Sequence, residues 1–567
     1  MRFEFRFVSA LEKVFCRPDF RPEFPLPADP CALPCLHVAR GEMAACQLMM
    51  KCDENIQLTF RAELPDGVSC AVREVGYVPC DIPSRPGNPD AASALPGLYP
   101  DPLLPVADAM RLTFGNWHAV YLTFRVSGNC APGEYEIPVH IDMVQPDGCP
   151  WPLPFDLHET ARIRLAVHRT VLAPQKIICT NWFHCDCLAR YYGVDLWSGP
   201  FWRIAENYWR DMTAHGRTML YTPLWTPPLD TAIGHERPTT QLLKVRFRDG
   251  KFSFDFSVLD AFIEHARKCG IGRFEMSHMF TQWGAAATPK IVVETENGEE
   301  KMFGWHVPSD SPAYRDFLSA LLPGLCRFLR EKGLSGKVYF HISDEPSEKN
   351  LAVYRAASEL VHKYLPSDEF PVMDALSKAE FARKKLLEIP VPTVSHYAEF
   401  EEEPLRERWF YYSGDIPGYP GASFGLPSRR NRIIGVLFYL YRIDGFLHWG
   451  HNFWFGQYSL DRDLDPWRCT TAGRAFCGGG SFNVYPGKDG CPVDSLHYEV
   501  FTLALQDLRL FQTLEAQIGR DAVVELIHEG LDHRIVLNRF PASAGWLERL
   551  HDRLLQKADE TLRPEKG

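Results

Sequence analysis

Two acidic residues, Asp344 and Glu345, stand side by side at the end of the apolar stretch KVYFHIS, and a proline follows them. Two carboxylates at this range cannot both ionise freely, because the charge on one raises the pKa of the other and partial burial adds to that shift. The expected result is one protonated acid beside one carboxylate, the division of roles that glycoside hydrolysis requires. The pair therefore predicts acid–base chemistry on a sugar.

The same pair has a purely structural interpretation. Acidic residues favour helix N-termini, so Asp344 and Glu345 could cap a helix that has Pro346 at its first position. The residue types at the neighbouring strand ends favour the chemical interpretation.

Aromatic and hydrogen-bonding side chains recur at the ends of nearly all the predicted strands in this part of the chain. Apolar sugar faces stack on aromatic rings, and sugar hydroxyls need carboxylate, amide or imidazole partners, so a carbohydrate pocket accounts for the mixture. A single tryptophan or lumen histidine is more often part of the core, and the recurrence is the stronger signal. The predicted substrate-binding residues are Trp182, His278, Asp374, Tyr397, Tyr412, Trp449, Asn452 and Trp454.

The elements that position these residues repeat in a fixed order from about residue 173. An apolar strand, a polar or aromatic tip and a helix-length amphipathic segment alternate, as expected for a (β/α)8 barrel. Side chains alternate along a strand, so His341 and Ser343 face the lumen and Glu345 continues that set. The eight predicted strands are residues 176–182, 217–225, 272–280, 337–345, 370–376, 391–397, 408–414 and 444–454.

Several local signals add helices and hairpins to this plan. A helix is expected between Ser311 and Gly333, although Pro323 should kink it. Asp249–Gly250 and Asn297–Gly298 predict hairpin turns within residues 244–256 and 290–303. Residues 494–519 predict the last barrel helix, with one amphipathic stripe for core packing.

The first part of the chain, to about residue 170, consists of short alternating runs separated by Pro, Gly and Asp clusters. This spacing predicts an all-β sandwich in a supporting role. The predicted fold class is therefore multidomain α and β: an N-terminal β-sandwich (1–172), a (β/α)8 TIM-like catalytic barrel (173–520) and a C-terminal helical tail (521–567).

Composition narrows the possible functions and locations. A formal net charge of -11 argues against nucleic acid as a partner, because that affinity depends on a positive surface. The sequence has no signal-peptide pattern and no apolar run long enough to span a membrane. The 17 cysteines lack framework spacing, which suits reduced thiols and predicts a cytoplasmic protein.

The sequence lacks the motifs of several other classes of site. It has no G-x-S-x-G elbow of a hydrolase triad, no phosphate-binding loop and no G-x-G-x-x-G after a strand, as a dinucleotide site would require. The tightest group of potential metal ligands is His184, Cys185, Asp186 and Cys187, but its spacing matches no common zinc pattern. We therefore expect neither a metal nor a cofactor.

The sequence also resembles glycoside hydrolase family 123, the β-N-acetylgalactosaminidases, and uncharacterised proteins that share their barrel. The resemblance spans nearly the whole chain, and the Asp-Glu motif is its most specific part. The matching stretches are TNWFHCDCLARYY, HISDEPSEKN, GFLHWGHNFW and VYPGKDGCPVDSLHYEVFTLALQDLRLFQTLE.

The resemblance implies a retaining exo-β-N-acetylgalactosaminidase in which the 2-acetamido oxygen of the sugar attacks the anomeric carbon and forms an oxazoline. Glu345 would protonate the leaving oxygen and later deprotonate water, while Asp344 would hold the acetamido N–H. The implied substrate is a glycan or glycolipid-derived oligosaccharide with terminal β-linked N-acetylgalactosamine. A glycosidase of another sugar specificity and a non-catalytic carbohydrate-binding barrel are the alternatives, and the sequence makes no prediction of oligomeric state.

Overall fold

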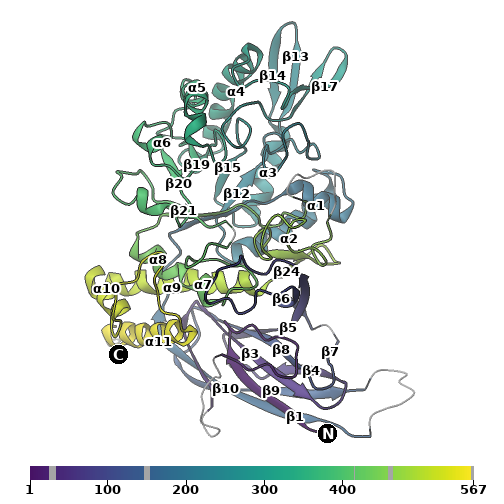
Figure 1. Cartoon of the computed structure of the whole chain (residues 1–567), viewed down its shortest axis with the longest axis vertical. Coiled ribbons are helices and arrows are strands. Elements are labelled where there is room, and N and C mark those ends of the chain that lie inside the picture. Colours follow the sequence, from purple (N-terminus) through teal and green to yellow (C-terminus); the bar gives the residue numbers. More distant parts are fainter. Residues whose placement is uncertain (24–32, 107, 146–153, 414, 457–463, 563–567) are drawn as a thin grey trace. The chain divides into compact units, whose positions relative to one another are not determined.

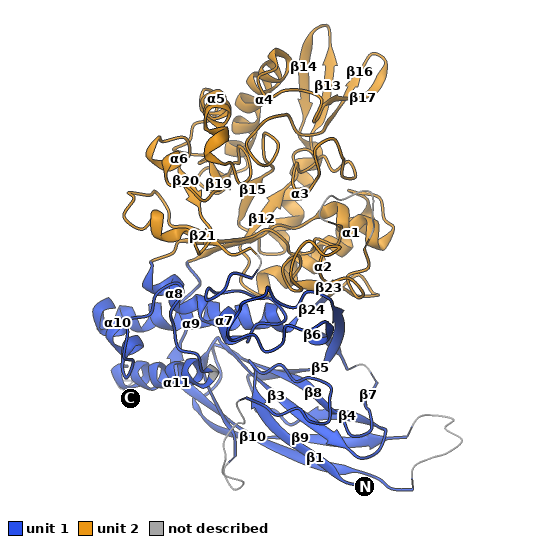
Figure 2. Cartoon of the chain, viewed as in Figure 1, with its two compact units in different colours: residues 1–176, 415–441, 493–567 blue, residues 177–414, 442–492 orange. Residues whose placement is uncertain are grey.

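The computed structural model describes residues 1–23, 33–106, 108–145, 154–413, 415–456 and 464–562 (Figure 1). The chain forms two compact units, each discontinuous in sequence (Figure 2). Unit 1 comprises residues 1–176, 415–441 and 493–567, and unit 2 comprises residues 177–414 and 442–492. The predicted division into domains 1–172, 173–520 and 521–567 stays a prediction.

Unit 1 contains two five-stranded sheets that share one apolar core. Alternate residues point inward, such as Leu48 and Leu122 from one sheet and Ile137 and Ile163 from the other. This confirms the β-rich N-terminal region. The strands of the first sheet are, in spatial order, β1 (Phe3–Ser9), β3 (Met43–Cys52), β8 (Trp117–Val126), β5 (Val68–Cys80) and β6 (Gly97–Pro105). Those of the second sheet are β2 (Cys35–Arg40), β10 (His158–Val171), β9 (Gly133–Val144), β4 (Ile56–Ala62) and β7 (Met110–Leu112).

Unit 1 also contains α7 (Arg429–Arg432), α8 (Ile434–Leu440), α9 (Leu496–Ile518), α10 (Arg520–His528) and α11 (Ala544–Thr561). The helix predicted for residues 494–519 is therefore present as α9, but it groups with unit 1 and not with the predicted barrel strands. It is also buried over far more than one stripe, including polar residues such as Glu499, Gln506 and Asp507. An amphipathic pattern predicts the helix but does not identify the element against which it packs.

Unit 2 is a mixed α/β structure built on parallel strands. Six of the predicted strands form one sheet, and the fifth and sixth form another, with the sixth displaced from the predicted residues 391–397 to residues 389–391. Ladder pairing among the described residues therefore does not produce a complete eight-stranded barrel. Two isolated parallel bridges, Phe340–Val372 and Thr393–Tyr411, also connect these segments. The strands of the six-stranded sheet are, in spatial order, β18 (Val338–Tyr339), β15 (Arg273–Met276), β12 (Met219–Thr222), β11 (Ile178–Asn181), β22 (Gly445–His448) and β21 (Trp409–Tyr411). The two-stranded sheet consists of β19 (Met373–Ala375) and β20 (Ile389–Val391).

The helices of unit 2 alternate with these strands along the chain. The predicted helix after Ser311 is confirmed, and it runs from Pro312 to Glu331 without a break at Pro323. The helical elements of the unit are α1 (Cys185–Tyr192), α2 (Gly199–Ala214), α3 (Ser257–Lys268), α4 (Pro312–Glu331), the 3-10 helix η1 (Glu348–Asn350), α5 (Leu351–His362), α6 (Glu380–Arg383) and the 3-10 helix η2 (Tyr397–Glu399).

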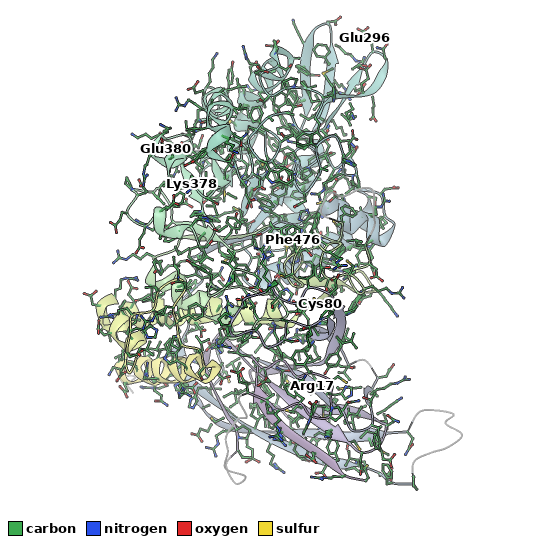
Figure 3. The ribbon with its side chains drawn as sticks, viewed as in Figure 1. Arg17, Cys80, Glu296, Lys378, Glu380 and Phe476 are labelled. Carbon is green, nitrogen blue, oxygen red and sulfur yellow. The ribbon has the colours of Figure 1, made fainter. Side chains whose placement is uncertain are left out.

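Two hairpins, β13 (Lys244–Arg248) with β14 (Lys251–Asp255) and β16 (Ile291–Thr295) with β17 (Gly298–Phe303), form a separate four-stranded sheet (Figure 1). The first turns at Asp249–Gly250 as predicted, with both residues at positive φ. The second turns at Glu296–Asn297, because Thr295 pairs with Gly298 (Glu296 is labelled in Figure 3). The turn predicted at Asn297–Gly298 is therefore displaced by one residue.

No helix in the described part of the chain combines the length and the apolar character needed to cross a membrane. All described cysteines are free thiols. The cytoplasmic location stays a prediction.

Candidate active site

The acidic pair lies where β18 has ended and the backbone turns sharply. Asp344 is half-buried and Glu345 is exposed. Glu345 has a φ of 43°, a left-handed conformation that is uncommon outside glycine and costs about 1–3 kcal/mol. Strain of this kind persists where the surrounding structure holds the residue in place, and it is concentrated at functional sites.

Neither acid caps the helices that follow. Ser347 occupies the N-cap position of η1 and Asn350 that of α5, and neither helix has a side-chain cap hydrogen bond. Among the described residues, no N–H of η1 or α5 donates to the carboxylate of Asp344 or Glu345. The capping interpretation of the pair is therefore wrong.

The electrostatics of the pair favour a proton on Asp344 in the free site. Burial raises the pKa of Asp344 well above its usual range, and the nearby charges of Glu345 and Asp230 add to that shift. The hydroxyl of Tyr411 donates a hydrogen bond to Oε1 of Glu345. Burial and the charge of Glu345 raise the pKa of Tyr411 well above its ordinary value, so that hydroxyl remains a donor.

The segment after β15 is hydrogen-bonded along the whole end of the fourth strand. The N–H of Met279 donates to the carbonyl oxygen of His341 at 3.0 Å, and the N–H of Trp283 donates to that of Asp344 at 2.6 Å. Trp283 has a φ of 62°, and 40% of the residue is exposed. The next residue is Gly284, where an added Cβ would lie 2.3 Å from the side chain of Asn350. A residue with a large, accessible aromatic side chain is thus hydrogen-bonded through its backbone to the backbone of Asp344.

Beneath the acids lies a buried polar cluster centred on Glu275. Its carboxylate accepts hydrogen bonds from Oγ1 of Thr180 at 2.6 Å and from Nε1 of Trp182 at 2.6 Å. His341 bridges Glu275, at 2.7 Å from Nε2, and Asp374, at 3.0 Å from Nδ1. Burial alone would lower the pKa of His341, but the hydrogen bonds and charges of these two acids raise it to about 9. The protonated ring therefore links two carboxylates and fixes the strand that leads to Asp344.

The ligand atoms of His278, His341 and Asp374 lie within 4.8 Å of one another, the spacing of a metal site. Both ring nitrogens of His341 are hydrogen-bonded to carboxylate oxygens, Nδ1 to Asp374 and Nε2 to Glu275, so contacts within the protein account for the spacing of His341 and Asp374. In the group considered from sequence, Asp186 accepts two hydrogen bonds from Arg237, at 2.9 and 2.8 Å.

The structure brings together three of the predicted substrate-binding residues around His341. His278 stacks on its ring with centroids 4.1 Å apart, the ring of Trp182 lies edge-on at 6.1 Å, and Asp374 is hydrogen-bonded to it. All three are buried. Asp374 also accepts a hydrogen bond from the hydroxyl of Tyr354 at 2.5 Å. Its hydrogen-bonding capacity is largely used within the protein.

The other five predicted binding residues are packed in the interior, and none is more than 7% exposed. The amide of Asn452 bonds both the backbone N–H and the carbonyl of His184. The ring of Trp449 lies 4.7 Å from that of Phe476 (labelled in Figure 3). Tyr397 packs on Phe410, Tyr412 on Phe446, and Trp454 on Tyr191 and Tyr208. A binding role for these residues stays a prediction.

Two residues of the site were not among the predicted substrate-binding residues. Glu275 is the one acidic residue in the strand RFEM, and alternation along that strand was the available signal. Tyr411 precedes the selected Tyr412, and neighbouring residues of a strand point in opposite directions. The dipeptide alone does not show which tyrosine meets Glu345.

Comparisons with known proteins identify a family and a fold for the chain. The family model for the glycoside hydrolase 123 catalytic domain matches residues 182–514. A family 123 glycoside hydrolase from Clostridium perfringens has a similar fold, with a TM-score of 0.72 and 14% identity over 99% of this chain and 98% of that chain. A glycoside hydrolase family 5 protein from Bacteroides vulgatus matches 54% of this chain and 63% of its own at 11% identity, and its TM-score of 0.29 supports no argument. No curated protein sequence matches the chain.

Proposed function

The chain belongs to glycoside hydrolase family 123 and is a glycoside hydrolase, and we propose that it removes terminal β-linked N-acetylgalactosamine with retention of configuration. The observation that carries the proposal is the adjacent pair Asp344 and Glu345, neither of which serves as a helix cap. Consecutive residues can reach the glycosidic oxygen and the C2 nitrogen of one sugar. An enzyme with a protein nucleophile instead needs carboxyl groups about 5 Å apart on opposite faces of the ring.

In the proposed mechanism, the acetamido oxygen attacks the anomeric carbon as Glu345 gives its proton to the leaving oxygen. Water then attacks the anomeric carbon of the resulting oxazolinium ion as it gives a proton back to Glu345, and the bond between that carbon and the acetamido oxygen breaks. Asp344 accepts a hydrogen bond from the acetamido N–H throughout and stabilises the positive charge that develops.

Substrate binding would also place the proton where the reaction needs it. In the free site the raised pKa of Asp344 and the hydrogen bond from Tyr411 to Glu345 favour a proton on Asp344. An acetamido N–H that donates to Asp344 favours the ionised form of that residue. The single proton shared by the pair then shifts to Glu345, which becomes the general acid.

We also propose that the parallel strands of unit 2 close into a (β/α)8 barrel with the acids at the carboxyl ends of its strands. The bridge Phe340–Val372 connects the β18 segment to the β19 segment, and Thr393–Tyr411 connects the β20 segment to β21. Together with the ladders, these bridges support a ring of eight strands. Trp182, His278 and Asp374 would form its floor, and Tyr397, Tyr412, Trp449, Asn452 and Trp454 its walls.

The substrate for the proposed reaction is a glycan or glycolipid-derived oligosaccharide. The similar Clostridium perfringens protein was analysed for glycolipid glycan hydrolysis, which supports this class. The test compares aryl β-N-acetylgalactosaminide with the matching aryl β-galactoside. We expect cleavage of the first alone, a β-configured first product, and competitive inhibition by N-acetylgalactosamine-thiazoline. Equal cleavage of both glycosides without thiazoline inhibition would contradict the substrate-assisted mechanism.

A further inference from the structure

A third acidic residue, Asp230, occupies the loop after β12, and the side chain of Gln282 is hydrogen-bonded to that loop. Its φ is 49°, so it joins Trp283 and Glu345 among the non-glycine residues with left-handed backbone in the loops after β12, β15 and β18. The side-chain amide of Gln282 accepts a hydrogen bond from the N–H of Asp230 at 2.7 Å and donates one to the carbonyl of Thr231 at 2.8 Å. Gln282 thus fixes the Asp230 loop, and the next residue, Trp283, is bonded to Asp344.

The carboxylate of Asp230 belongs to the same electrostatic environment as the pair. Burial raises its pKa to about 7, with Arg237 opposing and Glu345 adding to that shift. Asp230 in turn raises the pKa of Asp344. Arg237 already forms a bidentate ion pair with Asp186, so its charge is largely compensated.

Asp230 differs from the paired acids Glu275, Asp374 and Asp186 in having unused hydrogen-bonding capacity. Glu275, Asp374 and Asp186 each accept at least two hydrogen bonds from side chains of the protein. Among the residues that the structure describes, none donates a hydrogen bond to the carboxylate of Asp230. A half-buried carboxylate that keeps its acceptors free needs donors from outside the chain, because an unpaired buried polar group is costly.

We propose that Asp230 is a sugar-binding residue, whose carboxylate accepts hydrogen bonds from ring hydroxyls of the glycoside bound against Asp344 and Glu345. The ligand class is a neutral pyranoside. Three carboxyl groups with no free cation among the described residues beside them repel uronates and sulfated sugars, so Asp230 also selects against anionic glycans. The inference rests on the proposed function only in placing the sugar at the acidic pair.

The test compares Asp230→Asn with Asp249→Asn, a matched control at an exposed left-handed aspartate in a hairpin turn. Asparagine tolerates the left-handed region, so both variants should fold. Binding of uncleaved aryl β-N-acetylgalactosaminide is measured by calorimetry in a Glu345→Gln background. We expect Asp230→Asn to weaken binding by about 10- to 100-fold, the range for a hydrogen bond to a charged group, and Asp249→Asn to change nothing.

A pH profile separates hydrogen bonding from a merely structural effect. Asp230 faces the charges of Arg237, Glu345 and Asp344. Removing its negative charge lowers the pKa of Asp344, so the limb of the kcat/KM profile that reports loss of the shared proton should move to lower pH. Unchanged binding together with an unchanged profile in Asp230→Asn would overturn the inference.

Failure of this inference can be told apart from failure of the proposed function. If the wild type cleaves another neutral glycoside and not the acetamido sugar, the proposed specificity fails, and the same variants test Asp230 on the glycoside that is cleaved. If the wild type binds no neutral glycoside, or binds an aryl β-glucuronide as tightly as a neutral one, the inference about Asp230 is overturned.

Discussion

Buried acids are paired with cations in unit 1, whereas the acids at the end of the fourth strand in unit 2 are not. In unit 1, Arg432 forms a bidentate pair with Asp507 at 2.8 and 2.9 Å, Arg73 pairs with Glu499, and His551 lies 2.8 Å from Glu42. Among the described residues, none forms an ion pair with Asp230, Asp344 or Glu345 in unit 2.

The difference separates acids that hold a fold together from acids that do chemistry. A buried carboxylate beside an arginine stays ionised, and breaking such a pair destabilises the protein. A group of carboxyl groups without a counter-charge lacks that stabilisation, but it contains a proton that can be moved near neutral pH. Removing one of these unpaired acids of unit 2 should therefore affect activity, whereas breaking a buried ion pair of unit 1 should affect stability.

The largest expected effect is on catalysis. Glu345→Gln and Asp344→Asn should each reduce kcat/KM by about 10²- to 10⁴-fold, the usual contribution of general acid–base catalysis. The free energy of unfolding should stay the same or rise, because Glu345→Gln removes a repelling charge and Asp344→Asn replaces a protonated, neutral acid with a neutral amide. Steady-state kinetics and urea unfolding measure the two quantities, with exposed Glu348→Gln as the control. If a variant loses stability but keeps its kcat/KM, the acid that it replaces has a structural role like that of the ion-paired acids of unit 1 and does not take part in catalysis.

In unit 1 we expect the opposite result from Arg432→Leu. It leaves Asp507 buried without its partner, and breaking a buried ion pair costs about 3–5 kcal/mol of unfolding free energy. The kcat/KM of the protein that remains folded should not change. Arg246→Leu removes a cation from an exposed pair with Glu294, and we expect a loss below about 1 kcal/mol. Equal losses in the two variants would remove the distinction between buried and exposed pairs.

The sequence predicts features whose cause is local. The turn at Asp249–Gly250 follows from the conformations available to those two residues, and the start of α4 follows from Ser311 and Pro312. Asp344 and Glu345 could be identified because their adjacency is itself a property of the sequence. The strands of unit 2 were predicted for the same reason, since a short apolar run with a polar end is a local pattern.

Features that depend on distant partners were not predictable. The backbone of Asp230 is hydrogen-bonded to Gln282, which lies 52 residues further along the chain. The local segment PPLD, residues 227–230, contains no pattern that predicts this contact. Glu275 gains its importance from Thr180 and His341, which lie on other strands. The amphipathic pattern of α9 predicts a helix, but the same pattern fits either unit.

The smallest effect we predict concerns Trp283, the exposed ring whose backbone is bonded to Asp344. Aromatic stacking contributes about 0.5–1.5 kcal/mol beyond area burial, so Trp283→Ala should raise KM by about 2- to 12-fold. The kcat should change less, because stacking on the sugar stabilises the ground state and the transition state alike. Phe114→Ala, at an exposed aromatic of unit 1, is the control and should leave both parameters unchanged.

If kcat falls with KM unchanged, Trp283 positions Asp344 through its backbone and does not bind the sugar. That outcome would place Trp283 with the residues that support the acids and leave sugar binding to Asp230.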